Sequence, residues 1–287
     1  MLSYRHGFHA GNHADVLKHW LCVLTAQYMT QKDKPFLYVD THAAAGVYSL
    51  KSSIANKTAE FESGIKAIWD KDIPEVMTPF TDLIKQLNGS DKLKLYPGSP
   101  WFVNECLRAT DKARLFELHP QDYVLLKNNF KENRNIKVEK QDGFAGLKAL
   151  LPPPSKRAMV VIDPPYEQAH EYKMVVASIK DSIKRFASGV YIVWYPLINR
   201  TKSLTDTKKD MAQTMVRQLS LAGGKSFLDV RLWVNGKDEK EGMYGSGMAI
   251  INPPWNLAKQ LEEGLPFLVE SLGQTANAGY SVDHHEG

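Results

Sequence analysis

Cysteine is almost absent from this chain of 287 residues, which contains only Cys22 and Cys106. Two cysteines are too few for a disulfide-rich secreted scaffold or for a structural zinc site with four Cys ligands. Long apolar runs are missing too, since the densest, such as Ala158–Ile162, have the length of a strand. The N-terminus has no basic head followed by an apolar core, so no signal peptide is expected. These absences predict a cytoplasmic protein without membrane association.

Composition and net charge are unremarkable, but the charge is unevenly distributed. Hydrophobic residues make up 43% and charged residues 24% of the chain, which is ordinary for a globular protein and argues against disorder. The net charge of +4 allows a polyanionic partner without requiring one. Residues 180–225 hold nine basic and three acidic side chains, a balance of +6, so the rest of the chain carries −2. A phosphate-contacting surface needs such a segment, although solvated helix faces would give the same pattern.

Hydrophobic periodicity predicts a long N-terminal helix followed by alternating strands and helices. Apolar residues recur every four positions over Asn12–Tyr28, and Asn12 is a suitable N-cap. Seven strands are expected, at Phe36–Asp40, Ala113–Leu118, Ile136–Glu139, Ala158–Asp163, Gly189–Tyr195, Phe227–Val234 and Gly247–Asn252. Helical segments separate most of them, and this alternation indicates an α/β fold with a doubly wound, mostly parallel sheet.

A helical block lies between the first two expected strands. It contains one helix that should end at Asn88-Gly89 and another that should begin with Ser99 as N-cap and Pro100 in its first position. The block is too long for one crossover. We therefore expect a helical subdomain at residues 51–109, inserted into a domain formed by residues 1–50 and 110–287. The last ~25 residues, after Leu265-Pro266, are interpreted as a surface segment and tail.

The tetrapeptide Asp163-Pro164-Pro165-Tyr166 follows the fourth expected strand. Ligands of open α/β sheets bind where the strand order reverses, so Asp163 should project into a cleft. The tetrapeptide suits methyl transfer to a planar exocyclic amine, whose conjugated lone pair needs two hydrogen-bond acceptors to become nucleophilic. Asp163 is one acceptor, a carbonyl of the Pro164-Pro165 turn is the second, and Tyr166 offers a stacking face for a flipped-out base. The alternative, a mere Pro-Pro turn capped by Asp163, is disfavoured by the buried strand and by Tyr166.

A second Pro-Pro sequence, Asn252-Pro253-Pro254-Trp255, also follows an apolar strand. An amide oxygen and an indole face could support similar chemistry. This tetrapeptide ends the seventh expected strand, however, away from the expected switch point. We therefore assign it a structural role and keep the catalytic one as a minor alternative.

Small and acidic residues follow the first three expected strands. The loop Asp40–Gly46 would let the backbone approach an adenosyl ligand, and it is not the Gly-x-Gly-x-x-Gly pattern of dinucleotide sites. Glu117 could accept both ribose hydroxyls, while Asp142-Gly143-Phe144 could hold the adenine amine and ring. Each acid could instead cap a helix. Their recurrence at successive strand ends favours a methyl donor bound beside Asp163.

The N-terminus is rich in histidine, with His6, His9, His13 and His19 among its first 19 residues. A metal site is disfavoured because the usual companion acids and cysteines are missing. Lys18 and His19 could face the carboxylate of the donor, and the helix that starts at Ser99 is another candidate anion site. We further expect Tyr4, Arg5 and His6 to form an arm that orders over the substrate.

The order of these features resembles that of S-adenosylmethionine-dependent amino-methyltransferases. More specific segments carry a closer resemblance, and they are Met1–His6, His9–His19, Tyr96–Pro100, Glu117–Pro120 and Ser246–Met248 with the following Asn252–Trp255. Together they resemble the bacterial RlmJ family over nearly the whole chain. That family methylates N6 of an adenine in 23S ribosomal RNA, acting on protein-free RNA.

The resemblance implies a Rossmann-like class I methyltransferase domain with a small helical insertion, which converts S-adenosyl-L-methionine to S-adenosyl-L-homocysteine without a metal. It implies that Asp163 is the catalytic acceptor and that Tyr4 lies on the substrate side. The implied donor-binding residues are His19, His42, Ser99, Glu117, Asp142, Gly143 and Asp163. Ala44 stands where the family typically has Gly, so the loop that faces the donor is where this chain departs from the pattern.

Three other functions compete with RNA methylation. A DNA adenine-N6 methyltransferase would use the same catalytic tetrapeptide, but no large target-recognition domain is visible. A non-catalytic RNA-binding protein would not need Asp163. An NAD-dependent oxidoreductase would need the missing glycine pattern. The leading hypothesis is a monomeric 23S rRNA adenine-N6 methyltransferase.

Overall fold

A single large sheet organises the chain, which a computed structural model describes at residues 5–199, 211–239 and 241–286. Its eight strands lie in the order β10-β8-β9-β7-β6-β1-β4-β5. They are β1 (Leu37–Asp40), β4 (Lys112–Phe116), β5 (Ile136–Glu139), β6 (Ala158–Ile162), β7 (Val190–Asn199), β8 (Ser226–Trp233), β9 (Gly242–Ile251) and β10 (Gly279–Glu286). Every residue of β1 and β6 is buried, as expected for central strands covered on both faces.

The strand order confirms the predicted Rossmann-like fold. The neighbours β5, β4, β1, β6 and β7 are all parallel, whereas β9 is antiparallel to both β7 and β8. After β5 at one edge, the chain returns to β6 on the other side of β1. The order therefore reverses between β1 and β6, and the fourth strand of the sheet along the chain is the one beside the reversal. Asp163 directly follows that strand.

The expected strand count was wrong, because the sheet has eight strands rather than seven. The additional strand is β10, which pairs antiparallel with β8 from Gly279↔Trp233 to Glu286↔Ser226. The segment that was interpreted as a tail therefore completes one edge of the sheet. The residues directly after Leu265-Pro266 were also wrongly assigned to the tail, since α10 continues through Pro266 to Leu272.

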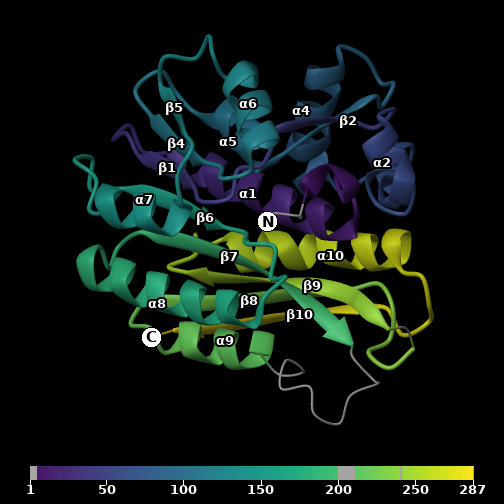
Figure 1. The fold of residues 1–287 in the computed structure, drawn as a ribbon. Helices are drawn as coiled ribbons and strands as arrows, with labels where there is room; N and C mark the ends of the chain where they lie inside the picture. Colours follow the sequence, from purple (N-terminus) through teal and green to yellow (C-terminus); the bar gives the residue numbers. More distant parts are fainter. Residues whose placement is uncertain (1–4, 200–210, 240, 287) are drawn as a thin grey trace.

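Helices cover both faces of this sheet (Figure 1). They are α1 (His13–Thr30), α2 (Ser53–Thr58), α3 (Ile65–Trp69), α4 (Thr78–Asn88), α5 (Ser99–Cys106), α6 (Pro120–Asn129), α7 (Gly143–Leu150), α8 (Ala169–Arg185), α9 (Met211–Ser220) and α10 (Leu257–Leu272). One buried cluster joins the sheet to α1, α10 and the helices between β1 and β4, and a second joins the other face to α7, α8 and α9. No helix among the residues described is long and apolar enough to cross a membrane.

The predicted insertion contributes to the core of the sheet. Residues 51–109 contain α2 to α5 and β3 (Leu95–Pro97), which pairs with β2 (Val47–Ser49) in a small separate sheet. Phe61, Ile65 and Phe80 from this segment belong to the same buried cluster as Trp20 of α1. The boundaries of the insertion as a subdomain remain a prediction.

Local signals at the helix ends were mostly predicted well. Asn12 caps α1, its Oδ1 accepting a hydrogen bond from the Asp15 amide at 2.9 Å. Gly89 ends α4 with φ of 60°, the left-handed conformation that glycine favours. The predicted N-cap role of Ser99 was wrong, because Gly98 occupies that position and Ser99 is the first residue of α5. Its hydroxyl is hydrogen-bonded elsewhere, to a buried carboxylate.

Candidate functional site

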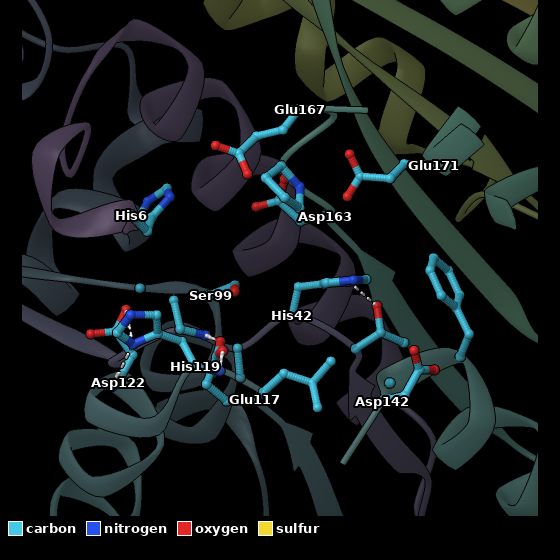
Figure 2. Close-up of a pocket in the computed structure, with 18 of the residues that line it drawn as sticks. His6, His42, Ser99, Glu117, His119, Asp122, Asp142, Asp163, Glu167 and Glu171 are labelled. Atoms are coloured by element: carbon cyan, nitrogen blue, oxygen red, sulfur yellow. Dashed lines mark hydrogen bonds and ion pairs between the residues drawn. The ribbon is translucent and has the colours of Figure 1, made fainter. Parts of the chain in front are cut away.

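A cavity of about 1220 Å³, open solvent at its mouth included, lies at the carboxyl ends of β1, β4 and β6. Figure 2 shows side chains from distant parts of the sequence around it, with Asp163, Glu167 and Glu171 on one side and Glu117, His119 and Asp122 on another. The cavity brings together most of the predicted site residues, namely His6, Lys18, His19, His42, Ser99, Glu117, Asp142, Gly143 and Asp163. They meet because parallel strands end at one edge of a sheet and the N-terminal ends of several helices face it.

A buried lysine holds the carboxylate of Asp163. Lys18 Nζ lies 2.6 Å from Asp163 Oδ2 and 2.9 Å from Asp15 Oδ1. Burial alone would lower the pKa of Lys18, but the two carboxylates raise it well above its usual value. Lys18 is therefore a cation that orients Asp163, and its contacts leave Asp163 Oδ1 available.

The same helix carries an ion-pair network that extends to the N-terminal segment. Asp15 Oδ2 lies 2.9 Å from His6 Nε2 and also accepts a hydrogen bond from the Gly11 amide. Burial by itself would raise the pKa of Asp15, but His6, Lys18 and His19 lower it well below its usual range. Arg5 extends the segment in another direction, with its guanidinium 2.9 Å from Asp122 Oδ1. Residues 5–15 are thereby tied to both sides of the cavity.

Glu117 shapes the loop that follows β1. Its Oε2 accepts a hydrogen bond from the Ala44 amide at 2.8 Å, and its Oε1 accepts one from the His119 amide at 2.6 Å. Burial raises its pKa, which these two amides counteract. Ala44 has φ of 48°, a left-handed conformation in which only glycine avoids a steric cost. The alanine therefore stands where the backbone itself favours glycine.

The third predicted element, Asp142-Gly143-Phe144, begins α7. Asp142 Oδ1 accepts a hydrogen bond from the Ala145 amide at 2.8 Å, so this acid is a helix cap that also lines the cavity. A Cβ on Gly143 would lie 2.0 Å from the Thr41 carbonyl oxygen, so only glycine allows α7 to begin this close to the β1 loop. Phe144 stacks edge-on against His42, with ring centroids 5.2 Å apart. Burial lowers the pKa of His42 to about 4, which leaves a neutral imidazole in the cavity at pH 7.

Two residues of the predicted catalytic tetrapeptide do not line the cavity. Tyr166 is only 5% exposed, its ring centroid lies 4.4 Å from that of Tyr172, and its hydroxyl donates a hydrogen bond to the Trp194 carbonyl. Because the ring is buried against Tyr172, it presents no open face to the cavity here. Pro165 lines the cavity, whereas Pro164, which stands between Asp163 and Pro165 in the sequence, does not. The stacking role of Tyr166 stays a prediction, and Tyr4 lies outside the described residues.

Sequence reasoning missed several residues at this edge. Asp40 is fully buried and accepts a hydrogen bond from Ser99 Oγ at 2.7 Å. Asp122, Glu167 and Glu171 line the cavity from the first turns of α6 and α8 and the loop before α8. Asp40 had a signal, because it ends the first buried strand. The others did not, since acids are common in the first turns of helices.

The second Pro-Pro tetrapeptide lies elsewhere. It follows β9, whose antiparallel direction carries Asn252 to the opposite edge of the sheet. Asn252 Nδ2 donates hydrogen bonds to the carbonyls of Ala187 and Gly189, and its Oδ1 accepts one from the Lys225 amide. Trp255 is 81% exposed. The side chain of Asn252 thus ties three loops together, as the structural assignment requires.

The basic segment predicted at residues 180–225 is only partly described. Its described basic side chains, all exposed, are Lys180, Lys184, Arg185, Arg217 and Lys225. Arg185 forms an ion pair with Asp181 at 2.9 Å along α8. The remaining basic residues of the segment lie at 200–210, outside the described residues, so the predicted phosphate-contacting surface stays a prediction.

Comparisons with known proteins agree with this architecture. The ribosomal RNA large subunit methyltransferase J of Escherichia coli is 45% identical over 273 residues, which cover 95% of this chain and 94% of that protein. The protein of the same name from Haemophilus influenzae is 42% identical and covers 99% of this chain and 98% of its own length. A crystal structure of protein LPL1258 from Legionella pneumophila has 35% identity and a TM-score of 0.86, over 97% of this chain and 98% of that one.

A family model extends the comparison from single relatives to a family. It is described as ribosomal RNA large subunit methyltransferase D, RlmJ, and it matches residues 33–285. The matched residues include all eight strands of the large sheet except the last residue of β10, and all of the strand ends that form the cavity. The resemblance seen in the sequence is thereby confirmed, and the chain belongs to the RlmJ family of ribosomal RNA methyltransferases.

Proposed function

We propose that this protein transfers a methyl group from S-adenosyl-L-methionine to N6 of an adenine in 23S ribosomal RNA. Family membership supports an RNA methyltransferase. The observation that carries the proposal is the position of Asp163, which lines a cavity at the reversal of the strand order together with Glu117 and Asp142, the acids that follow β4 and β5. A carboxylate in this position can accept a hydrogen bond from an exocyclic amine while a second ligand occupies the rest of the cavity.

The residues around the cavity fit an adenosyl methyl donor. Each oxygen of Glu117 is bonded to one backbone amide and keeps a second acceptor site, so the two oxygens can receive the two ribose hydroxyls. Asp142 keeps one oxygen free of its cap bond and can accept from the adenine amine. His42, Gly143 and Phe144 line the same part of the cavity, where the two rings can contact the adenine ring of the donor. We assign these residues, with Lys18, His19, Ser99 and Asp163, to the donor site.

Asp163 is the proposed catalytic residue. Lys18 fixes its Oδ2, which leaves Oδ1 to accept one hydrogen of the target amine. A carbonyl of the Pro164-Pro165 turn accepts the other hydrogen, so the nitrogen lone pair leaves conjugation with the ring. The donor supplies an electrophilic methyl group on a sulfonium. The scheme needs no metal ion, because two oxygen acceptors activate the amine, and it needs no second copy of the chain, because all of the groups named belong to one chain.

The RNA is expected to approach over the N-terminal segment. We propose that Tyr4, Arg5 and His6 contact it and that Tyr166 stacks on the flipped-out adenine. In the described structure Arg5 is bound to Asp122 and Tyr166 to Tyr172, so RNA binding would require both contacts to be exchanged. Base–aromatic stacking is worth about 1–3 kcal/mol, enough to offset part of that exchange.

The experiment incubates the full chain and labelled S-adenosyl-L-methionine with protein-free 23S rRNA, assembled large subunits or adenine-containing duplex DNA. Nucleoside mass spectrometry should find N6-methyladenosine in the free rRNA. Label in DNA alone would favour the DNA methyltransferase alternative. Absence of label from all three, with the chain folded, would contradict the proposal.

A further inference from the structure

Asp40 is a fully buried carboxylate at the end of β1 with an unusual set of partners. Its Oδ2 accepts hydrogen bonds from Tyr38 Oη and from Ser99 Oγ, both at 2.7 Å, and its Oδ1 accepts one from the His42 amide at 3.2 Å. Among the residues that the structure describes, no cationic nitrogen lies within 4.0 Å of it. A buried negative charge that is hydrogen-bonded but lacks a counter-ion is costly, and a cation bound nearby would offset that cost.

Ser99 is the only one of these partners that belongs to the lining of the cavity and has a hydroxyl. A serine hydroxyl has one proton and two acceptor lone pairs. The proton is used by the bond to Asp40, so Ser99 Oγ can present only lone pairs to a ligand. The cavity therefore has, at this point, an acceptor connected to an unbalanced negative charge.

We infer that Asp40 is a positioning residue that turns Ser99 Oγ into an acceptor for the α-ammonium group of the donor's amino-acid moiety. The inference rests on the donor site proposed above. The protonated amine of that moiety donates hydrogen bonds and also carries a positive charge, which would balance the negative charge of Asp40. If the proton of Ser99 instead pointed into the cavity, the hydroxyl and the ammonium group would face each other as two hydrogen-bond donors.

Calorimetric titration of the full chain with three probes tests this polarity. The probes are S-adenosyl-L-homocysteine, an analogue without its α-amino group and an analogue without its α-carboxylate. Ser99→Ala removes the acceptor. Asp40→Asn removes the negative charge and, in the orientation that keeps the His42 amide bonded to its oxygen, sets the new NH₂ against the two hydroxyls, so that Ser99 becomes an acceptor and its proton can turn into the cavity. Tyr38→Phe is the matched control, because it removes a donor to the same carboxylate and leaves the Ser99 bond in place.

We expect Ser99→Ala and Asp40→Asn to weaken both amine-containing probes about 10- to 100-fold, as loss of a hydrogen bond to a charged group does, with little change for the amine-free analogue. Tyr38→Phe should affect the three probes alike. Equal weakening of all three by Ser99→Ala would overturn the inference and leave Ser99 a packing residue. If Asp40→Asn does not fold, the Ser99→Ala series decides. Failure of the unaltered chain to bind S-adenosyl-L-homocysteine would refute the proposed donor site, and the inference with it.

Discussion

Two tetrapeptides of similar sequence lie at opposite ends of the strands of one sheet. Asp163-Pro164-Pro165-Tyr166 follows β6, and Asn252-Pro253-Pro254-Trp255 follows β9. Each follows buried strand residues, which are all of β6 and the last seven residues of β9, and each tetrapeptide contains one residue with positive φ, Tyr166 at 51° and Asn252 at 55°. They differ in the fate of the polar side chain. Asp163 faces a cavity and an ammonium group, whereas Asn252 is bonded to three backbone groups of neighbouring loops.

Strand direction explains this difference better than local sequence does. β6 runs parallel to β1 and β7, so its carboxyl end joins those of its neighbours at the edge where the strand order reverses. β9 runs antiparallel to both β7 and β8, so its carboxyl end lies beside the amino ends of these two strands. A strand followed by Pro-Pro and an aromatic residue is therefore a functional signal only when the direction of the strand is known.

The largest expected effect separates the two tetrapeptides by activity. Asp163→Ala should reduce the rate of methyl transfer about 10²- to 10⁴-fold, because only the carbonyl of the Pro164-Pro165 turn would remain to accept a hydrogen of the target amine. Asn252→Ala should leave the rate per folded molecule within a factor of about two. Single-turnover assays on protein-free 23S rRNA measure both. A few per cent or more of the original rate in Asp163→Ala would contradict the catalytic assignment.

The second expected effect separates the two tetrapeptides by what they contribute to the stability of the fold. Asn252→Ala removes three hydrogen bonds and leaves an alanine at φ of 55°, so it should lower the free energy of unfolding by about 2–3 kcal/mol. Urea denaturation followed by circular dichroism measures this. Asn252→Gly would be the control for the backbone contribution, since glycine accepts positive φ. An unfolding free energy unchanged in both variants would show that the loops do not depend on this side chain.

Acid should lower the free energy of unfolding because of a buried histidine in the helix that carries Lys18. α1 brings Lys18 to the cavity and begins with His13, which is buried and whose pKa burial lowers from 6.5 to about 4. The unfolded chain therefore binds a proton between these values that the folded chain does not, and stability is lost as pH falls through that range. At pH 5 the loss from this one group should be about 2 kcal/mol relative to pH 7. Urea denaturation of the unaltered chain and of His13→Gln at both pH values measures it, and an equal pH dependence in the two would refute the assignment.

Much of the fold follows from signals within short stretches of sequence. Val160 and its neighbours form an uninterrupted apolar run, as central parallel strands do, and Asn12 and Gly89 delimit helices by side-chain and backbone chemistry that needs no tertiary context. β10 was missed for the opposite reason. Its residues, which include Asp283 and His284, are polar and largely exposed, and only the edge of β8 makes them a strand.

The residues of the site divide in the same way, into those that a local signal predicts and those whose contacts depend on the tertiary structure. Asp163, Glu117 and Asp142 could be found because each follows a strand that the sequence predicts, and the carboxyl ends of parallel strands share an edge of the sheet. The bond from Ser99 to Asp40 joins residues 59 positions apart and had no local signal. Lys18 could be expected near the cavity, but not its contact with Asp163, which depends on how α1 crosses the sheet. Tyr166 shows that the identity of a residue does not fix which way its ring faces.

The smallest expected effect concerns the backbone of the loop that follows β1 and lines the cavity. Ala44 has φ of 48°, and its amide donates to Glu117. Left-handed φ costs a non-glycine residue about 1–2 kcal/mol. Ala44→Gly removes that cost but gives the unfolded chain an entropy gain of about 0.4–1 kcal/mol. The net change should be stabilising by a few tenths of a kcal/mol up to about 1 kcal/mol, with the bond to Glu117 kept because it uses the amide. Denaturant titration together with binding of S-adenosyl-L-homocysteine tests this. Destabilisation would mean that the Ala44 methyl group makes packing contacts that outweigh the strain of its left-handed backbone.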